Sequence, residues 1–485
     1  MASTAWMCGS CPTDCSLLPM NGEHEAPEAT PVKILVVVGT RPEAIKLVPM
    51  ILALKESDLF IPQVVSTGQH QDMVKEVFEL AGIEIDFNLW VGGARSELND
   101  RVREVMGRLD DFVRVQYGAD GTVKQEEVAA GDYPMAIMVQ GDTTSAFAAA
   151  LAAFHLRIPV IHLEAGLRTG SNLTPFPEEL NRELITCIAA FNLAPTSHNL
   201  ENLVRENVPV SQIFITGNTG IDSLQWAAGL EVEFSDPIVG EICASDRRVV
   251  TVTAHRRENW GEGIDGISAG IRLLAIEHPD TYFVIPQHPN PAVREQWANL
   301  NDLPNICLTD ALSYPEFARL MVRSFLLITD SGGIQEEAPS LGKPVLVCRD
   351  STERGEGIEA GTLKLVGTEP ASIQAGADLL LRDENAYREM SEADNPYGDG
   401  HASERIVAAL TNLYIGGPMP QPFRSSYSRN AVIKASGYTL PAAATGRLDP
   451  ALVPEAERHH EEVVVDPVGL LWSEFGTITE KWFRT

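Results

Sequence analysis

Three carboxylates stand where an α/β sheet would present them to a single ligand: Asp142, Glu164 and Glu178. One apolar run ends at Asp142, and a second, residues 159–163, ends at Glu164. Because ligands of an open parallel sheet bind beyond the carboxyl ends of its strands, we expect both side chains in one crevice, with Glu178 on a loop that folds over them. Three carboxylates around a crevice favour proton transfer on a polar substrate. Each residue taken alone also fits a helix N-cap or a loop acid.

A second set of residues suits a phosphate-bearing ligand. Ser331, Gly332 and Gly333 open a helix directly after a strand, and free N–H groups at a helix start favour an anion, although a plain strand-to-helix turn has the same pattern. Glu336 and Glu337 follow within one turn, where one could accept hydrogen bonds from ribose hydroxyls or act as a favourable first-turn acid. The cationic side chains on or near the loops after expected strands, each of which also fits a structural ion pair, are Arg41, Lys46, His255, Arg256, Arg257 and Arg354.

Strands and helices alternate along most of the chain and must position these groups. Residues 33–38 form a continuous apolar run typical of a strand buried on both faces, and Thr40 and Glu43 form a capping box for the helix that follows. The same alternation recurs in residues 216–387, which predicts an α/β fold with two doubly wound parallel sheets and a site in the cleft between them. Residues 91–133 are less regular and are interpreted in part as a surface insertion.

Both ends of the chain fall outside this alternation. Residues 1–31 are small, polar and proline-containing, which predicts a disordered tail. Residues 414–485 begin with a linker-like stretch and are interpreted as an irregular C-terminal extension. Cys8, Cys11 and Cys15 have no fourth nearby ligand, so no metal site is expected in the first segment.

The composition excludes several classes of function. The net charge of the 485 residues is −30, which argues against nucleic acid or an anionic membrane as a partner. No run reaches about 18 apolar residues and the first residues lack the pattern of a secretory signal, so we expect a cytoplasmic protein. The first strand is not followed by G-x-G-x-x-G, and the chain has no P-loop and no H-E-x-x-H motif, so we expect no nicotinamide, metal or other cofactor.

Seven motifs together resemble the non-hydrolysing UDP-N-acetylglucosamine 2-epimerase family. The likeness runs in order from about residue 32 to about residue 413, and chance agreement over that length is negligible. The motifs are GTRPEAIK (39–46), QGDTT (140–144), HLEAGLRTG (162–170), PFPEELNR (175–182), HRREN (255–259), DSGGIQEEAPSLGKP (330–344) and NPYGDG (395–400).

The resemblance implies a GT-B fold. An N-terminal Rossmann-like domain of residues 32–215, joined by a crossing helix at about 388–413, would face a C-terminal UDP-binding domain of residues 216–387. It also implies a homodimer that interconverts UDP-N-acetylglucosamine and UDP-N-acetylmannosamine in polysaccharide biosynthesis. The C2–H of such a sugar is not next to a carbonyl and a nicotinamide fingerprint is missing, so the remaining route is anti elimination of UDP to 2-acetamidoglucal, followed by re-addition.

The resemblance also implies roles for individual residues. Asp142, Glu164 and Glu178 correspond to the acid/base set, without settling which of them takes the C2 proton. Lys46 and His255 correspond to helpers near the sugar and the diphosphate. The positions that match contacts to the uracil, the ribose and the diphosphate are Phe317 for the uracil, Glu337 for the ribose, and Arg41, Ser331, Gly332, Gly333 and Arg354 for the diphosphate.

Two departures from the family pattern are visible. Asp72 and Ser96 replace glutamines of a second site, at which many bacterial members bind UDP-N-acetylglucosamine as an activator. A carboxylate beside a bound diphosphate weakens its binding, so we expect weakened or altered activation. Gly355 stands where the family usually has proline, which should loosen the loop that carries Arg354. The other positions that match the second site are Gln69, His70, Arg95, Arg256 and His288.

Three other functions fit parts of this pattern. A hydrolysing epimerase shares the glucal intermediate but releases N-acetylmannosamine and UDP. A GT-B glycosyltransferase shares the fold and the UDP site but needs an acceptor. A sugar-nucleotide sensor would keep the cleft without turnover, and the presence of all three carboxylates argues against it.

Overall fold

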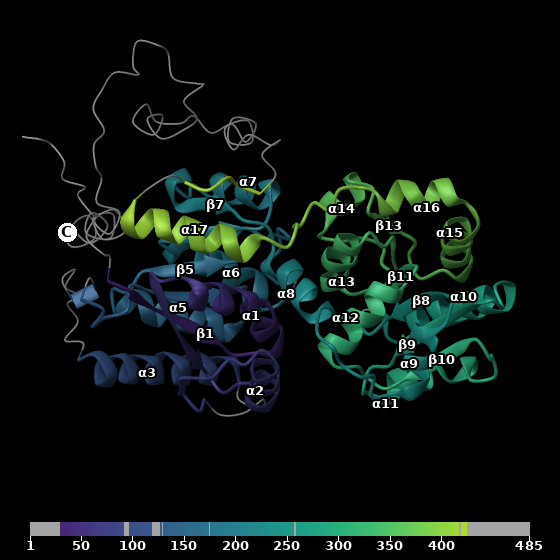
Figure 1. Ribbon diagram of the computed structural model, residues 1–485, viewed down its shortest axis with the longest axis horizontal. Coiled ribbons are helices and arrows are strands. Elements are labelled where there is room, and N and C mark those ends of the chain that lie inside the picture. Colours follow the sequence, from purple (N-terminus) through teal and green to yellow (C-terminus); the bar gives the residue numbers. More distant parts are fainter. Residues whose placement is uncertain are drawn as a thin grey trace, which may run out of the picture.

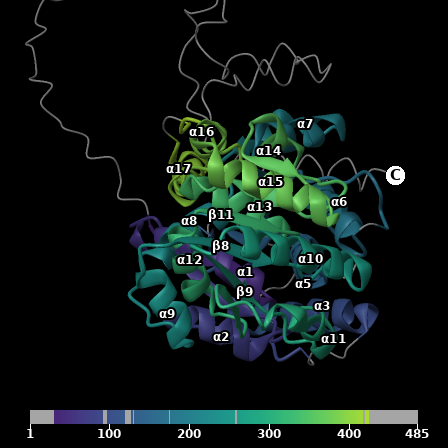
Figure 2. The ribbon, with the colours of Figure 1, turned by 90° about the vertical axis from the view of Figure 1, so that its right-hand side faces the viewer.

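Two lobes lie side by side in the computed structural model, each built on a parallel sheet that carries helices on both faces (Figure 1, Figure 2). The structure describes residues 30–91, 97–118, 127–128, 130–173, 175–256, 259–416 and 419–423. Most of the predicted N-terminal tail and most of the C-terminal extension therefore lie outside the described residues.

The N-terminal lobe contains seven parallel strands within these ranges. From edge to edge they are β3 (Phe87–Asn88), β2 (Phe60–Ser66), β1 (Val32–Val38), β4 (Ala136–Gln140), β5 (Val160–Leu163), β6 (Phe191–Ala194) and β7 (Ile213–Ile215). The order reverses between β1 and β4, which is where an open α/β sheet forms its binding crevice. The helices of this lobe are α1 (Arg41–Glu56), α2 (Gln71–Leu80), α3 (Leu98–Tyr117), α5 (Thr144–His155), α6 (Glu178–Ile188) and α7 (Ser197–Arg205), with a 3₁₀ turn η1 (Val210–Gln212).

The C-terminal lobe repeats this arrangement with six described strands. Their order is β10 (Ile306–Thr309), β9 (Thr281–Pro286), β8 (Arg248–Thr253), β11 (Leu326–Thr329), β12 (Val345–Val347) and β13 (Leu363–Leu365), so its reversal lies between β8 and β11. The other elements from this part of the chain are α8 (Thr219–Ala228), α9 (Pro237–Ala244), α10 (Glu262–Glu277), α11 (Pro291–Glu295), η3 (Ala298–Leu300), α12 (Tyr314–Arg323), α13 (Gly332–Glu337), η4 (Ala338–Leu341), α14 (Gly355–Glu359), α15 (Pro370–Arg382), α16 (Glu384–Ser391) and α17 (Ala402–Ile415).

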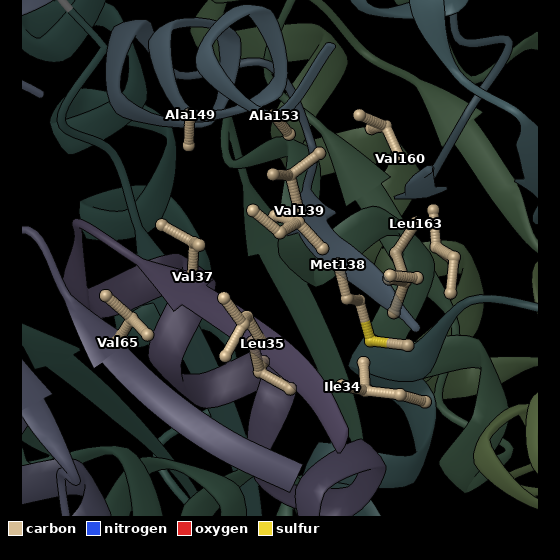
Figure 3. Close-up of a cluster of buried hydrophobic side chains, with 14 of the residues drawn as sticks. Ile34, Leu35, Val37, Val65, Met138, Val139, Ala149, Ala153, Val160 and Leu163 are labelled. Atoms are coloured by element: carbon tan, nitrogen blue, oxygen red, sulfur yellow. The ribbon is translucent and has the colours of Figure 1, made fainter. Parts of the chain in front are cut away.

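The centre of the N-terminal sheet is packed on both faces, as its continuous apolar strands predict. Figure 3 shows Val139 of β4 beneath Ala149 and Ala153 of α5. All three side chains are fully buried, and the alanines let α5 approach the sheet closely. The loops that leave β4 and β5 therefore start from a rigid base.

Two helices join the lobes. The hydroxyl of Ser223 in α8 donates to the carbonyl of Ile45 in α1, 2.8 Å away, just after the chain has crossed from the N-terminal lobe. The last described helix, α17, returns to that lobe, where the Tyr414 hydroxyl donates to the Thr30 carbonyl at 2.6 Å. A crossing helix was expected at about 388–413, but α17 begins only at Ala402, after an irregular stretch that follows α16.

The predicted α/β fold with two doubly wound parallel sheets is confirmed, and so is the capping box of Thr40 and Glu43. The interpretation of residues 91–133 was incomplete, because α3 fills residues 98–117. The sequence gives only a weak signal for this helix, because its buried positions recur only every fourth residue and the first of them is an arginine. These positions are Arg101, Val105, Leu109 and Val113.

None of the helices in the described ranges combines the length and the apolar character needed to cross a bilayer.

Candidate active site

Asp142 lies just beyond β4 and is held by helix α6. Arg182 donates from Nε to Oδ2 of Asp142 at 3.0 Å, and its Nη2 donates to the same oxygen. Asn181 donates to the Asp142 carbonyl at 2.9 Å, so two consecutive residues of α6 fix both the backbone and the side chain. Burial raises the pKa of Asp142, Arg182 opposes that rise without cancelling it, and the Glu164 charge adds to it.

Glu164 lies just beyond the neighbouring strand, β5, and is bound by a lysine. Lys46 Nζ is 2.7 Å from each Glu164 oxygen, and Gln140 Nε2 donates to Oε2 at 2.5 Å. Burial is the largest influence and would raise the pKa of Glu164, but the charge and hydrogen bond of Lys46, together with the charges of Arg354 and Arg182, lower that pKa overall. The Glu164 backbone has φ = 63°, a strained conformation for a residue with a side chain, of the kind that concentrates at functional sites.

The two carboxylates therefore differ in their affinity for a proton, although each acts on the other electrostatically. Asp142 holds a proton more readily than a free aspartate, whereas Glu164 stays ionised more readily than a free glutamate. Environments that push two neighbouring pKa values apart are what acid/base pairs use. Glu178 is the first residue of α6, and its partly exposed side chain makes no hydrogen bond to another described residue.

The predicted anion site lies at the opposite reversal point, after β11. Gly332 opens α13 beneath the guanidinium of Arg354: a Cβ at this glycine would lie 2.8 Å from Arg354 Cζ, so no other residue fits there without displacing the arginine. Arg354 donates from Nε to Glu336 at 2.9 Å and from Nη1 to Glu353. Ser331 is the N-cap of the same helix, and its side chain makes no cap hydrogen bond to the first N–H groups.

Glu337 and Phe317 lie beside this turn. The Tyr314 hydroxyl is 3.4 Å from Glu337 Oε1, and burial raises the pKa of Glu337 to about 8 despite the opposing charge of Lys46. Phe317 belongs to α12, the helix that also carries Tyr314, and is partly buried between two apolar clusters. The side chains expected at the ribose and the uracil therefore lie on adjoining helices of the C-terminal lobe.

His255 stands on the loop after β8, held by a buried aspartate. Asp330 accepts from the backbone N–H groups of His255 and Arg256 at 3.0 and 2.9 Å, which fixes this loop against the start of the glycine turn. The His255 ring stacks on His288, with ring centres 6.0 Å apart. Burial lowers the pKa of His255 although the Asp330 charge opposes that effect, so the neutral imidazole is favoured.

Charges from the two lobes meet across the cleft. The Arg354 charge contributes to lowering the pKa of Glu164, and the Glu336 charge contributes to raising the pKa of Lys46. Asn218, at the crossing between the lobes, donates to Glu336 at 2.7 Å and lines a pocket together with Glu164. The structure thus brings together Asp142, Glu164, Lys46 and Arg354, as predicted, and places Arg41 as the first residue of α1, directly after the capping Thr40.

The positions assigned to a second nucleotide site divide between the lobes. Gln69 and His70 follow β2, where Gln69 accepts from Ser145 at 2.7 Å. Arg256 and His288 follow strands of the C-terminal lobe, and Arg95 lies outside the described residues. Burial, and then the Arg101 charge, lowers the pKa of His70. Within the described chain, no interaction joins Gln69 or His70 to Arg256 or His288, so the second nucleotide site stays a prediction.

Sequence reasoning missed several residues that shape the site. Arg182, Asn181 and Gln140 lie within the quoted motifs, but no role was given to them. The signal was available for Arg182, because an arginine inside an amphipathic helix four residues after Glu178 faces the same strand ends as that carboxylate. For Asn218 no sequence signal places it opposite Glu336, since the contact spans the two lobes.

One group of three side chains in the described ranges has the spacing of a metal site: Glu277, His278 and Asp378. Its acids are already engaged, because Arg382 binds both carboxylates at 2.5 Å and His278 lies 2.8 Å from Asp378. We assign no metal to it.

The comparisons with known proteins agree with one another. The family described as UDP-N-acetylglucosamine 2-epimerase matches residues 52–411. The UDP-N-acetylglucosamine 2-epimerase of Escherichia coli K12 is 44% identical over 391 residues, which span 79% of this chain and 99% of that protein. The enzyme of the same name from Bacillus subtilis is 42% identical over 384 residues, 79% of this chain and 96% of that one.

Solved structures give the same result. The Neisseria meningitidis UDP-GlcNAc 2-epimerase bound to UDP-GlcNAc superposes with a TM-score of 0.67 at 40% identity, covering 79% of this chain and all of that one. The Methanocaldococcus jannaschii UDP-GlcNAc 2-epimerase in complex with UDP-GlcNAc and UDP gives a TM-score of 0.61 at 30% identity, covering 78% and 99% of the two chains.

Proposed function

Because this chain belongs to the UDP-N-acetylglucosamine 2-epimerase family, we propose that it interconverts UDP-N-acetylglucosamine and UDP-N-acetylmannosamine without hydrolysis. The observation that carries the proposal is the pair of ion pairs at the N-terminal reversal point, Asp142 with Arg182 and Glu164 with Lys46, facing Arg354 of the other lobe. The sugar end of a sugar nucleotide needs groups that transfer a proton, and its diphosphate needs groups that bind it. The N-terminal lobe supplies the first and the C-terminal lobe supplies the second.

The reaction proceeds by elimination. A carboxylate removes the proton from C2, the C1–O bond to UDP breaks with the electron pair leaving on the phosphate oxygen, and a C1–C2 double bond forms. The products held in the site are 2-acetamidoglucal and UDP. Return of a proton to C2 from the opposite face, with addition of the same phosphate oxygen to C1, gives the epimer. No atom is gained or lost, so no co-reactant is consumed.

The assignment of the two carboxylates follows from their surroundings. Glu164 is kept ionised by Lys46 and acts as the base that removes the C2 proton of one epimer. Asp142 retains a proton more readily and delivers it from the other face, and in the reverse direction the two exchange roles. Glu178 is the third member of the acid/base set, at the start of α6.

The clamp is formed by the glycine turn and Arg354. Backbone N–H groups at the start of α13 and the guanidinium stabilise the charge that develops on the diphosphate as C1–O breaks. Glu337 accepts from the ribose and Phe317 packs on the uracil. We further propose a cytoplasmic homodimer that needs no cofactor, as the family resemblance and the missing dinucleotide fingerprint imply.

Proton NMR of the purified protein with UDP-N-acetylglucosamine in D₂O tests the proposal. UDP-N-acetylmannosamine with deuterium at C2, formed without added cofactor, is the expected product. Free N-acetylmannosamine and UDP would assign the chain to hydrolysing enzymes instead. An unchanged spectrum would contradict the proposed substrate and direct the search to another UDP-sugar or to an acceptor.

A further inference from the structure

Glu179 and Arg182 of α6 form a buried network of ion pairs beside Asp142, called the relay below. Glu179 is fully buried and the Arg182 side chain is 7% exposed, one helical turn apart on the same face. Arg182 Nη1 donates to Glu179 Oε2 at 2.9 Å, while its Nε and Nη2 donate to Asp142. The guanidinium is thus shared between two carboxylates, only one of which belongs to the proposed acid/base set.

The far end of the relay is fastened to the backbone. Glu179 Oε1 accepts from the N–H groups of Thr169 and Gly170 at 2.7 and 2.9 Å. Those residues belong to the loop that begins at Glu164. The relay therefore ties the loop after β5 to the side chain after β4, and it sets the distance between the two carboxylates through fixed hydrogen bonds.

We infer that Glu179 and Arg182 are positioning residues, which hold the Asp142 carboxylate in line for proton transfer at C2. This inference rests on the proposed function. A flexible lysine would supply the charge but not the planar fork that binds one carboxylate on each edge. Displacement of a proton-transfer group by 1 Å costs about 100-fold in rate, so loss of the fork should appear in kcat.

Arg182→Gln is the first test. We expect kcat to fall about 100-fold with KM for UDP-N-acetylglucosamine within about threefold of the parent, because the diphosphate clamp is untouched. Arg182→Lys should recover part of the loss. In an Asp142→Asn background, Arg182→Gln should add little further loss, since a residue that acts through Asp142 has nothing left to position.

The pH profile separates positioning from general damage to the fold. The charged groups with the largest effect on Asp142 are Arg182 from α6, Glu164 after β5 and Lys46 from α1, and the Glu179 charge lies behind Arg182. Burial raises the pKa of Asp142 and Arg182 lowers it. Without Arg182 that pKa rises, so the alkaline limb of the kcat–pH profile moves to higher pH. Glu179→Gln removes a negative charge behind Arg182, so the same limb moves to lower pH. Opposite shifts in two variants of one relay are not expected from a loss of stability.

The outcomes are distinguishable from failure of the proposed function. If Asp142→Asn retains full epimerisation, the acid/base assignment itself fails. If Asp142→Asn is inactive while Arg182→Gln and Glu179→Gln keep the parent kcat and pH profile, only the relay is overturned. Thermal unfolding and calorimetric UDP binding are measured on each variant. If Arg182→Gln does not fold, the isosteric Glu179→Gln variant decides on its own.

A separate observation concerns the first residues of the C-terminal extension, which follow α17 along the edge of the N-terminal sheet (Figure 1). The N–H of Phe423 donates to the Ile215 carbonyl of the edge strand β7 at 3.0 Å. Its buried ring lies 3.7 Å from the place of a Cβ on Gly217, the residue at which the chain crosses between lobes. The guanidinium of Arg405 lies 5.5 Å from the ring centre and donates to the Thr216 carbonyl.

We propose that residues 419–423 act as a strap over this crossing and set the equilibrium between open and closed lobes. The segment lies beyond residue 411, where the family match ends. The strap touches the first of the two segments by which the described chain crosses between the lobes.

Two truncations and one substitution test the strap. A chain that ends at Phe423 should keep the parent kinetics. A chain that ends at Gly416, and the full chain with Phe423→Ala, should change KM for the UDP-sugar by about threefold or more, with a matching change in the compaction that UDP produces in solution scattering. Parent kinetics and scattering in the chain that ends at Gly416, or equal behaviour of the two truncations, would overturn the strap.

Discussion

The carboxyl edge of the N-terminal sheet presents carboxylates, whereas the same edge of the C-terminal sheet presents hydrogen-bond donors and a guanidinium. Both sheets have the same strand order around their reversal points. In the first, Asp142 and Glu164 are each paired with a cation, Arg182 and Lys46. In the second, Arg354 is paired with acids and stands over a glycine turn. Topology therefore decides where a site lies, and the residues at the strand ends decide its charge and its hydrogen-bonding groups.

The sharpest test of this division is to disable the N-terminal edge alone. Asp142→Asn and Glu164→Gln should each lower the rate of epimerisation by about 10³-fold, because general acid/base groups contribute about 10²–10⁴-fold. Binding of UDP, measured by calorimetry, should stay within about threefold of the parent. Loss of UDP binding together with turnover in either variant would contradict the division of proton transfer and UDP binding between the two lobes.

A variant of Lys46 tests whether its charge is what keeps the Glu164 carboxylate of the N-terminal lobe ionised. Lys46→Met should lower kcat about 100-fold, since a buried carboxylate left without its cation is strongly disfavoured in its ionised form. Burial alone raises the pKa of Glu164 and Lys46 lowers it, so without the lysine that pKa rises and the acidic limb of the pH–rate profile moves to higher pH. Lys55→Met, at the exposed end of the same helix, is the matched control and should leave the limb in place. An unmoved limb in Lys46→Met would contradict the pairing.

Much of this arrangement could be predicted from the sequence, and the limit has a physical cause. Asp142, Glu164 and the glycine turn were predicted because strand ends show as breaks in apolar runs, and parallel strands bring their ends to one edge. Helix α3 was missed because its buried face includes Arg101 and repeats only every fourth residue. The contact of Asn218 with Glu336 could not be predicted, because it depends on tertiary packing across 118 residues.

Glu337 tests the C-terminal edge by its pH dependence. Its pKa is raised to about 8 by burial, so below pH 8 the free site holds a proton. If UDP binds the ionised form, binding releases that proton, and affinity should rise by up to about tenfold per pH unit until pH 8 and then level off. Glu337→Gln should remove this dependence and weaken UDP binding about tenfold at pH 8, while turnover at saturation changes little. Calorimetry of both proteins from pH 6 to pH 9 isolates the effect, since any titration of UDP itself is common to the two.

The second nucleotide site gives a smaller test within the N-terminal lobe. Asp72 is exposed in the first turn of α2, where the family has glutamine, and its charge should oppose a bound diphosphate. Asp72→Gln should therefore strengthen activation by UDP-N-acetylglucosamine, seen as a faster reaction of UDP-N-acetylmannosamine when a trace of the epimer is added. Glu76→Gln, exposed one turn further along the same helix, is the control. Strong sigmoidal activation in the parent protein would contradict this prediction.

The smallest effect is expected at Gly355, beside the C-terminal clamp. Gly355 is the first residue of α14, directly after Arg354, and a Cβ there would meet no atom within 4 Å. Its φ is not in the left-handed region, so Gly355→Ala fits the native backbone and removes freedom only from the unfolded chain. We expect about 0.4–1 kcal/mol of added stability in urea unfolding, with KM for the UDP-sugar equal to or slightly below that of the parent. Gly361, with φ = 83°, is the contrasting site, because Gly361→Ala is strained there and should destabilise the fold. If both variants destabilised it equally, the loop of Arg354 would not have the backbone conformation described here, and the clamp would lose its structural basis.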